Sequence, residues 1–286
     1  MSQLIKASSA AYHRIDRLSS SRLAAFLESR EDYHARYVAK TKSRPMSDAF
    51  IVGGAVHALV LEGRKAFEEE YVSPPEKIDR RTKAGKQQFA EWQKAAEGKI
   101  VLSSSQWDTV QGVVESLSNH GMFIHLMRGG SYSREQAMLF ELHGVECKAK
   151  PDLYGEFGGQ PCLIDIKTTA NAHPSEFIRK SYEYGYATRL AFYLEGVIGL
   201  PQWSDAKFED WRCMLVACSK DKPYVCSVYE YDTDYMALGR SQVHAIVRDL
   251  AVCHKTGKWE SPWSSQIQTI RCPSWARLKE ETHVDS

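Results

Sequence analysis

The sequence lacks several features that would assign it to a specialised class of protein. No apolar run approaches the roughly 20 residues needed to span a bilayer, and the first ten residues lack the apolar stretch of a secretory signal. The seven cysteines form an odd set with no C-x-x-C pair, which argues against a disulfide framework and against a clustered zinc or iron–sulfur site. We therefore expect a cytoplasmic protein with reduced thiols and no membrane association.

An excess of charge of either sign is also missing. Lys and Arg number 37 and Asp and Glu number 36, so the formal net charge is +1. Proteins that coat nucleic acid without specificity are usually more basic, although a neutral protein can still carry a basic groove. Any nucleic-acid function must therefore be inferred from a specific site.

Two common catalytic motifs are absent as well. Gly85-Lys86-Gln87 has neither the spacing nor the Ser or Thr of a P-loop, and no G-x-G-x-x-G opens a helix. No G-x-S-x-G is present. These absences argue against P-loop nucleotide hydrolysis and against a serine hydrolase of the nucleophile-elbow type.

What is present is the composition of a folded globular chain of 286 residues, with 43% hydrophobic and 26% charged residues and no repeat or linker. We expect one domain with a mainly helical part at 1–130, an α/β core at 131–260 and an irregular tail at 261–286. Hydrophobic periodicity predicts helices at about 19–37, from 47, at 83–96, from 103, at 175–199 and at 233–254. It predicts strands at 135–143, 146–154, 161–167, 212–219 and 224–231, the last two as a hairpin.

The informative stretch runs from Lys148 to Lys167. Residues two apart on a strand face the same side, so Lys148, Lys150 and Asp152 are expected on one face, and Asp165 and Lys167 on one face of the next strand. Such a pattern is more often a solvated face with weak ion pairs. Here the apolar run Cys162-Leu163-Ile164 precedes Asp165 and indicates a buried strand, which favours a functional site.

The turn between these strands predicts their register. Gly158-Gly159 suits a type I′ turn, in which both central residues have positive φ. Asp152 would then lie opposite Asp165, with Cα atoms about 4.5–5.5 Å apart. Paired carboxylates repel each other, and a divalent cation is the usual remedy; oxygen ligands favour Mg²⁺, with Mn²⁺ as a substitute. Lys167 would place an ammonium beside the ion, where it can orient a water or stabilise charge on a phosphoryl oxygen.

Through the motifs Pro151-Asp152 and Asp165-Ile166-Lys167, the chain resembles the PD-(D/E)xK nucleases. Three other segments resemble the exodeoxyribonuclease VIII (RecE-type) nuclease domain, namely 53–59, 186–193 and 273–276. The resemblance covers about residues 18–280 and implies an α/β (α+β) restriction-endonuclease-like core with a mixed central sheet flanked by helices. It also implies metal ligands at His57, Asp152, Asp165 and the Ile166 carbonyl, and a catalytic lysine at Lys167.

Two of these assignments have alternatives. A histidine on an otherwise apolar helix is more often a satisfied core residue, but Gly53 and Gly54 suggest close approach of another backbone to the helix of His57. The resemblance also implies an additional catalytic acid, for which Glu135 and Glu141 are both candidates because they share one strand face.

One position departs from the family. The helix after Lys167 usually carries Gln four residues before Tyr, whereas here Arg189 precedes Tyr193. We expect Arg189 to point toward a DNA path, sharing a face with Tyr182, Tyr186 and Tyr193; the alternative is an ion pair with Glu183 or Glu195. Further candidate DNA contacts are Arg179, Lys180, Tyr182 and Tyr186, and, as weaker candidates, Arg22, Arg30, Lys83 and Lys86.

Together these features predict a Mg²⁺-dependent exodeoxyribonuclease that degrades linear double-stranded DNA from its ends. The resemblance alone implies 5′→3′ polarity, phage-type homologous recombination, a homo-oligomeric ring and a single-strand annealing protein as partner. The competing hypothesis, prompted by Arg189, is a DNA-binding or assembly protein on the same fold with weak or lost catalysis.

Overall fold

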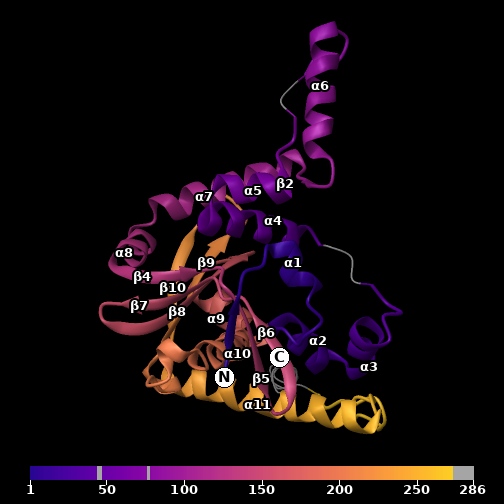
Figure 1. The fold of residues 1–286 in the computed structure, drawn as a ribbon, viewed down its shortest axis with the longest axis vertical. Helices are drawn as coiled ribbons and strands as arrows, with labels where there is room; N and C mark the ends of the chain where they lie inside the picture. Colours follow the sequence, from indigo (N-terminus) through magenta and orange to yellow (C-terminus); the bar gives the residue numbers. More distant parts are fainter. Residues whose placement is uncertain (44–46, 76–77, 273–286) are drawn as a thin grey trace, which may run out of the picture.

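A five-stranded mixed sheet forms the centre of the computed structural model, which describes residues 1–43, 47–75 and 78–272 (Figure 1). Its strand order is β10-β9-β8-β7-β4, and only the β8–β9 pair is parallel. The strands are β4 (Gly130–Arg134), β7 (Leu153–Phe157), β8 (Gln160–Thr169), β9 (Arg212–Ser219) and β10 (Cys226–Tyr231). The predicted hairpin at 212–231 and the mixed sheet are thus confirmed.

A second, three-stranded sheet has the order β1-β5-β6, with β1 at Gln3–Ile5, β5 at Ala137–Leu142 and β6 at Val145–Ala149. The prediction of one strand over 146–154 is wrong, because β6 and β7 belong to different sheets. The break falls at Lys150–Asp152, and its physical cause is Pro151, which has no N–H to donate to a ladder. Strands β1 and β4 were not predicted.

The register between β7 and β8 agrees with the prediction from the glycine turn. Leu153 pairs with Ile164 and Phe157 with Gln160, and Gly158 and Gly159 have φ of 60° and 77°. The ladder ends one residue before Asp152 and Asp165 would pair. Asp152 is therefore placed by the predicted register but lies just outside the strand.

Helices cover both faces of the sheet. One hydrophobic core packs Leu163 and Leu215 against α2, α10 and α11, and the other packs Ile164 and Ile166 against α4, α7 and α8. Side chains alternate along β8, so Asp165 and Lys167 face the same side as Leu163. In Figure 1, α11 runs along one end of the molecule and α6 stands away from the other end.

Five helices, α2, α4, α6, α7 and α11, begin after a Ser, Thr or Asp whose side chain caps the first turn, and several helices are shorter than expected. The expected helix at 19–37 is α2, α3 and a π-helical turn at His34–Val38, and the expected helix at 175–199 divides at Gly185, whose φ is +61°. The bounds are α1 Ser9–Arg14, α2 Ser20–Glu28, α3 Arg30–Tyr33, α4 Asp48–His57, α5 Arg64–Glu70, α6 Lys83–Ala96, α7 Ser104–Asn119, α8 Gly121–Gly129, α9 Pro174–Glu183, α10 Tyr186–Ile198 and α11 Thr233–Thr256.

Candidate metal and catalytic centre

The end of β8 holds two charged side chains inside the protein. Asp165 is 1% exposed, and the Nζ atom of Lys167 lies 2.5 Å from its Oδ2. Within the described part of the chain, neither carboxylate oxygen of Asp165 accepts a hydrogen bond of normal geometry. Buried carboxylate oxygens rarely remain without a hydrogen bond of normal geometry, because the desolvation of a charged acceptor is costly. The site therefore has unused capacity for a cationic ligand.

Asp152 precedes β7 and reaches across to β8. Its Oδ2 accepts a hydrogen bond from the Ile166 N–H at 2.6 Å, so the carboxylate is held against the strand that carries Asp165. The contact explains why Asp152 can leave the β7 ladder: its side chain takes over a backbone donor at the point where the regular pairing ends.

Glu135 lies in the connection between β4 and β5 with a φ of +47°, in the left-handed region that non-glycine residues rarely adopt. Its N–H donates to the Asp152 carbonyl at 2.9 Å, which fixes the two acidic residues to each other. Its Oε2 lies 2.5 Å from the Nζ of Lys150. The rival Glu141 is exposed on β5 and pairs in register with Glu146, so Glu135 is the candidate that the structure brings to the site.

His57 ends α4 and connects that helix to the other side chains. Its Nε2 lies 2.8 Å from the Ile166 carbonyl oxygen, and its Nδ1 lies 3.3 Å from Asp152 Oδ1 and 3.7 Å from Glu135 Oε1. The adjacent Gly53 and Gly54 of α4 allow this placement of His57. The prediction that another backbone approaches these two glycines is wrong. Cβ atoms on Gly53 and Gly54 would instead meet the side-chain oxygens of Thr168, at 3.4 Å, and Tyr71, at 2.3 Å.

These five residues, His57, Glu135, Asp152, Asp165 and Lys167, form what we call the carboxylate cluster. Burial would lower the pKa of His57, but the nearby Asp152 and Glu135 carboxylates raise it to about 10. Burial and the neighbouring Asp152 charge raise the pKa of Asp165 to about 6. Burial opposes charge on Asp152 and Lys167, yet their oppositely charged neighbours lower the pKa of Asp152 and raise that of Lys167. The cluster is thus a set of strongly interacting charges in a dry site.

The donor set fits a divalent metal ion. One ligand atom from each of His57, Glu135 and Asp152 lies within 4.8 Å of the other two. Asp165, whose Oδ1 has no partner among the described residues, and the Ile166 carbonyl, which meets His57 Nε2, add further oxygen ligands. Carboxylate and carbonyl oxygens with one imidazole suit Mg²⁺ or Mn²⁺ better than a thiolate-binding metal.

Comparison with known proteins places this geometry in a family. The model of a PDDEXK-like domain of unknown function (DUF3799) matches residues 19–272. The chain belongs to this family. No curated protein matches the sequence.

The PDDEXK-like fold of this family member also appears among solved structures. A protein from Eubacterium rectale, provisionally assigned as an exonuclease, is 15% identical with a TM-score of 0.61, over 96% of this chain and 98% of that chain. LHK-Exo in complex with dAMP is 15% identical with a TM-score of 0.31, over 86% of this chain and 96% of that chain, a likeness too low to carry an argument. The predicted fold class, a PD-(D/E)xK core with a mixed sheet between helices, is therefore confirmed.

In this PDDEXK-like protein, α10 supplies two of the predicted DNA-contacting residues beside the carboxylate cluster. Tyr193 accepts a hydrogen bond from Ser20 Oγ at 2.9 Å, and it lies near enough to Lys167 for each to influence the pKa of the other. Arg189 is half-buried, its guanidinium lies 5.9 Å from the Tyr186 ring centroid, and its Nε has no hydrogen-bond partner among the described residues.

The two carboxylates suggested as ion-pair partners of Arg189 are engaged elsewhere. Glu195 pairs with Arg240 and His244, and Glu183 pairs with basic residues of its own helix. No ion pair of Arg189 is present among residues that the structure describes. The alternative, that Arg189 forms a structural ion pair with Glu183 or Glu195, therefore has no support in these contacts.

The basic residues of α9 are arranged differently. Arg179 pairs with Glu176 and Glu183, and Lys180 with Glu183, all on the helix surface. Tyr182 is 69% exposed, whereas Tyr186 is buried at the start of the next helix. The expected common face of these tyrosines is wrong because the chain turns at Gly185 between the two helices.

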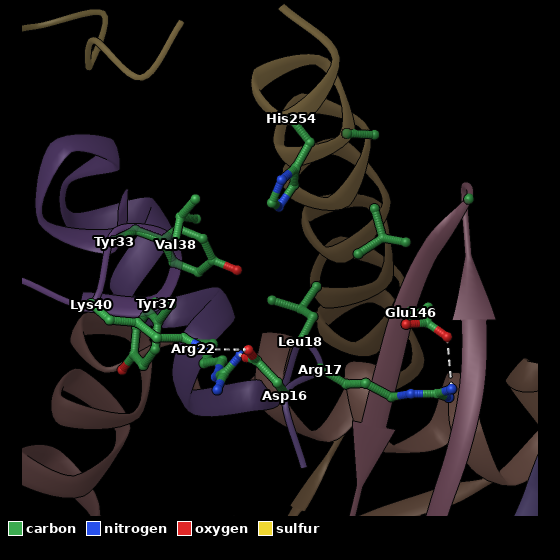
Figure 2. A pocket seen from close by; sticks show the side chains of 13 residues that line it. Asp16, Arg17, Leu18, Arg22, Tyr33, Tyr37, Val38, Lys40, Glu146 and His254 are labelled. Atoms are coloured by element: carbon green, nitrogen blue, oxygen red, sulfur yellow. Dashed lines mark hydrogen bonds and ion pairs between the residues drawn. The ribbon is translucent and has the colours of Figure 1, made fainter. Parts of the chain in front are cut away.

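A pocket of about 460 Å³ lies between α2, α3, the β5–β6 turn and the end of α11, away from the carboxylate cluster (Figure 2). Arg22 points into this pocket, pairs with Asp16 at 2.7 Å and stacks over the Tyr37 ring at 4.7 Å. Lys40 pairs with the same Asp16, and Arg17 with Glu146. Arg30 likewise pairs with Asp249. Arg22 and Arg30 thus already have carboxylate partners.

Three supporting residues were not assigned a role from the sequence. Lys150 balances Glu135, and Ser20 positions Tyr193. Lys148, expected on the face of Asp152, instead donates to the carbonyls of Tyr12 and Ile15 and anchors α1. In the sequence, Pro151, which lies between Lys148 and Asp152, was the one indication that these two side chains would not share a strand face.

None of the helices in the described ranges has the length and hydropathy required to cross a membrane. The motif at 273–276 lies outside the described residues, as does the rest of the predicted tail from 273 onward.

Proposed function

We propose that this protein is a Mg²⁺-dependent exodeoxyribonuclease, with Mn²⁺ as a substitute, that hydrolyses phosphodiester bonds from the ends of linear double-stranded DNA. The observation that carries the proposal is the buried carboxylate pair of Asp152 and Asp165 in a chain of the PDDEXK-like family: Asp165 Oδ1 has no partner among the described residues, and Asp165 Oδ2 meets only the Lys167 ammonium. A buried carboxylate pair of this kind needs a cation, and an ammonium next to it suits the charge that develops on phosphate during hydrolysis.

The residues have distinct proposed roles. His57, Asp152, Asp165 and the Ile166 carbonyl would hold the metal, which when bound polarises a phosphoryl oxygen and lowers the pKa of a water molecule. Lys167 would orient the attacking water and stabilise negative charge on the phosphoryl group. Glu135 would accept a proton or hold a water, and its ion pair with Lys150 fixes its orientation.

Contacts to the DNA strand come from α10 in this proposal. The half-buried guanidinium of Arg189, which makes no ion pair among the described residues, offers a phosphate donor, and Tyr193 lies on the same helix. Tyr186 is buried under Arg189, so it would position that side chain rather than stack on a base. Arg179 and Lys180 would bind phosphate only after exchanging their glutamate partners. The resemblance to RecE-type exonucleases suggests 5′→3′ polarity, a homo-oligomeric ring and cooperation with a single-strand annealing protein in phage-type recombination.

The competing function is DNA binding or assembly with weak catalysis. It rests on Arg189 in place of the family glutamine, but Arg189 packs on Tyr186 and, among the described residues, makes no ion pair with the carboxylate cluster. The full set of cluster residues is present, and this observation favours the enzyme.

A labelled-end assay tests the proposal. Linear duplex labelled at the 5′ or the 3′ end is incubated with Mg²⁺, with Mn²⁺ or with chelator, and a covalently closed circle of the same sequence serves as the control. Release of mononucleotides from linear DNA only with metal, with the circle intact, is the expected result. Intact linear DNA under every divalent metal would refute the function, and the order of label release gives the polarity.

A further inference from the structure

Residues 73–75 and 78–99, which we call the α6 arm, leave the body of the protein after β2 and return to it at β3, beside the same place. In Figure 1, helix α6 of this arm stands clear of the sheets and of the helices that cover them. The flanking strands β2 (Tyr71–Val72) and β3 (Ile100–Val101) pair in parallel and hold the two ends together. With 14 residues, α6 is about 21 Å long.

The base of the arm is fixed to the helix that carries His57. Tyr71 is 4% exposed, stacks on Phe67 with ring centroids 5.5 Å apart, and brings its hydroxyl against Gly54. Gly54 precedes His57 by three residues, which is about one helical turn. The arm therefore begins next to the carboxylate cluster and projects outward from it.

The described residues of the arm also pack on one another. The Trp92 Nε1–H donates to the Ser73 carbonyl at 3.1 Å, and the Phe89 and Trp92 rings stack with centroids 5.7 Å apart. Arg80 covers the Phe89 ring at 4.6 Å, and Thr82 caps α6 by accepting from the Gly85 N–H. These contacts give the arm a small apolar cluster of its own.

Charge is concentrated on this projection. Residues 78–99 contain six Lys or Arg and three Asp or Glu, a net charge of +3, whereas the whole chain carries +1. The remaining residues therefore sum to −2. A projection that holds the positive charge of a nearly neutral protein creates a local field that attracts polyanions.

Three lysines carry this charge on the outer face of α6. Lys83, Lys86 and Lys94 fall within about 80° of one another around the helix axis, and their mean direction lies about 130–140° from that of Phe89 and Trp92. All three are exposed, and within the described ranges none makes an ion pair, in contrast to Arg81, which pairs with Asp79. The ammonium groups are thus available to an external anion.

We propose that the α6 arm binds the phosphate backbone of duplex DNA outside the carboxylate cluster, through Lys83, Lys86 and Lys94. The inference rests on the proposed nuclease function and adds a second contact region to it. A duplex carries about one negative charge per 1.7 Å of its axis, so the length of α6 spans about 12 phosphates. Unpaired lysines on a helix suit contacts to phosphate that do not depend on base sequence.

The test compares two triple variants with the same change in net charge. The arm variant is Lys83→Gln, Lys86→Gln and Lys94→Gln. The control variant is Lys207→Gln, Lys255→Gln and Lys258→Gln, three exposed lysines outside the arm; Lys255 belongs to α11, at the other end of the molecule (Figure 1). Glutamine suits a helix, so both variants should fold, which circular dichroism checks.

Affinity for a duplex of about 30 base pairs is measured against salt concentration in chelator. We expect the arm variant to lose up to about 2.7 from the slope of log K against log salt, and at least tenfold in affinity at about 0.1 M salt. The control variant should match the wild type. Equal behaviour of the two variants would overturn the inference, as would a change in oligomeric state without a change in slope, which would make the arm a contact between copies.

Cleavage distinguishes this inference from the proposed function. In the presence of Mg²⁺, the arm variant should lose at least tenfold in kcat/KM on the long duplex but stay within twofold on a hairpin with a stem of about 6 base pairs, which is too short to occupy the arm. Equal loss on both substrates would overturn the inference. If the wild type cleaves neither substrate while the slopes still differ, the nuclease function fails and DNA binding by the arm stands.

Discussion

The carboxylate cluster and helix α9 both bring acidic and basic side chains together, but they satisfy these charges differently. On α9, Arg179 and Lys180 are bound by Glu176 and Glu183 on an exposed surface. In the cluster, Asp165 is almost fully buried: its Oδ2 meets the Lys167 ammonium, and its Oδ1 has no hydrogen-bond donor among the described residues. Exposed pairs need nothing further, whereas a buried excess of acceptors indicates a ligand.

The largest expected difference between the two regions is in catalysis. Lys167→Ala should reduce kcat for DNA hydrolysis by at least about 10²–10³, because the ammonium beside Asp165 is lost while the metal ligands remain. Lys207→Ala, an exposed lysine far from both regions in sequence, serves as the control. Single-turnover hydrolysis measures the effect, and calorimetry with Mg²⁺ should show binding retained; near wild-type cleavage would remove Lys167 from the mechanism.

Asp165→Asn sharpens the comparison through stability. The pKa of Asp165 is raised from 3.8 to about 6, so the folded state binds this proton more tightly than the unfolded state. Its contribution to stability is complete below pH 4 and is lost as the pH rises through 6. Asparagine resembles the neutral acid, so in chelator the variant should be about 1–3 kcal/mol more stable than the wild type at pH 8.

The pH dependence identifies the cause of that gain. Urea unfolding of both proteins at pH 4 and pH 8 should show the difference only at pH 8, and Mg²⁺ affinity should fall in the variant. A difference of the same size at both pH values would mean that packing, not charge, had changed.

Arg189 is half-buried, whereas Asp165 of the cluster is buried and Arg179 of α9 is exposed. Arg189 has no ion pair among the described residues. Arg189→Ala should weaken DNA binding and reduce the salt slope by about 0.9, the value of one phosphate contact. Arg189→Gln should keep activity within roughly tenfold, about 1.4 kcal/mol of barrier. An unchanged slope together with a lower Tm for Arg189→Ala would make the residue structural.

The smallest effect is expected on α9 itself. Arg179→Gln removes two exposed ion pairs, which contribute little because water and salt screen them. Its Tm should stay within about 1 °C of the wild type in thermal unfolding. A large drop would show that charges on α9 matter as much to the fold as those of the cluster and would remove the contrast.

The parts of the site that were predictable from the sequence follow short-range rules. The positive φ of Gly158 and Gly159 determines the β7–β8 register, and strand alternation then places Asp165 and Lys167 on one side of the sheet. These features depend on a two-residue turn and a period of two, which a sequence displays directly.

What could not be predicted depends on contacts distant in sequence. Pro151 ends one strand, but only the packing of two sheets shows that the chain crosses between them there. Glu135 reaches the cluster because a left-handed backbone turn and a bond to the Asp152 carbonyl direct it inward. No periodicity distinguishes it from Glu141, which the same alternation places on β5.

The parallel pairing of β2 with β3 has a consequence for how this fold can diverge. Because Tyr71 lies beside Ile100 and Val72 beside Val101, the 27 residues between Val72 and Ile100 begin and end about one strand spacing apart. The PDDEXK-like core therefore holds this segment at two neighbouring anchors. The residues between the anchors can change in length or sequence without repacking the sheet, so the proposed DNA contact of the arm can vary independently of the carboxylate cluster.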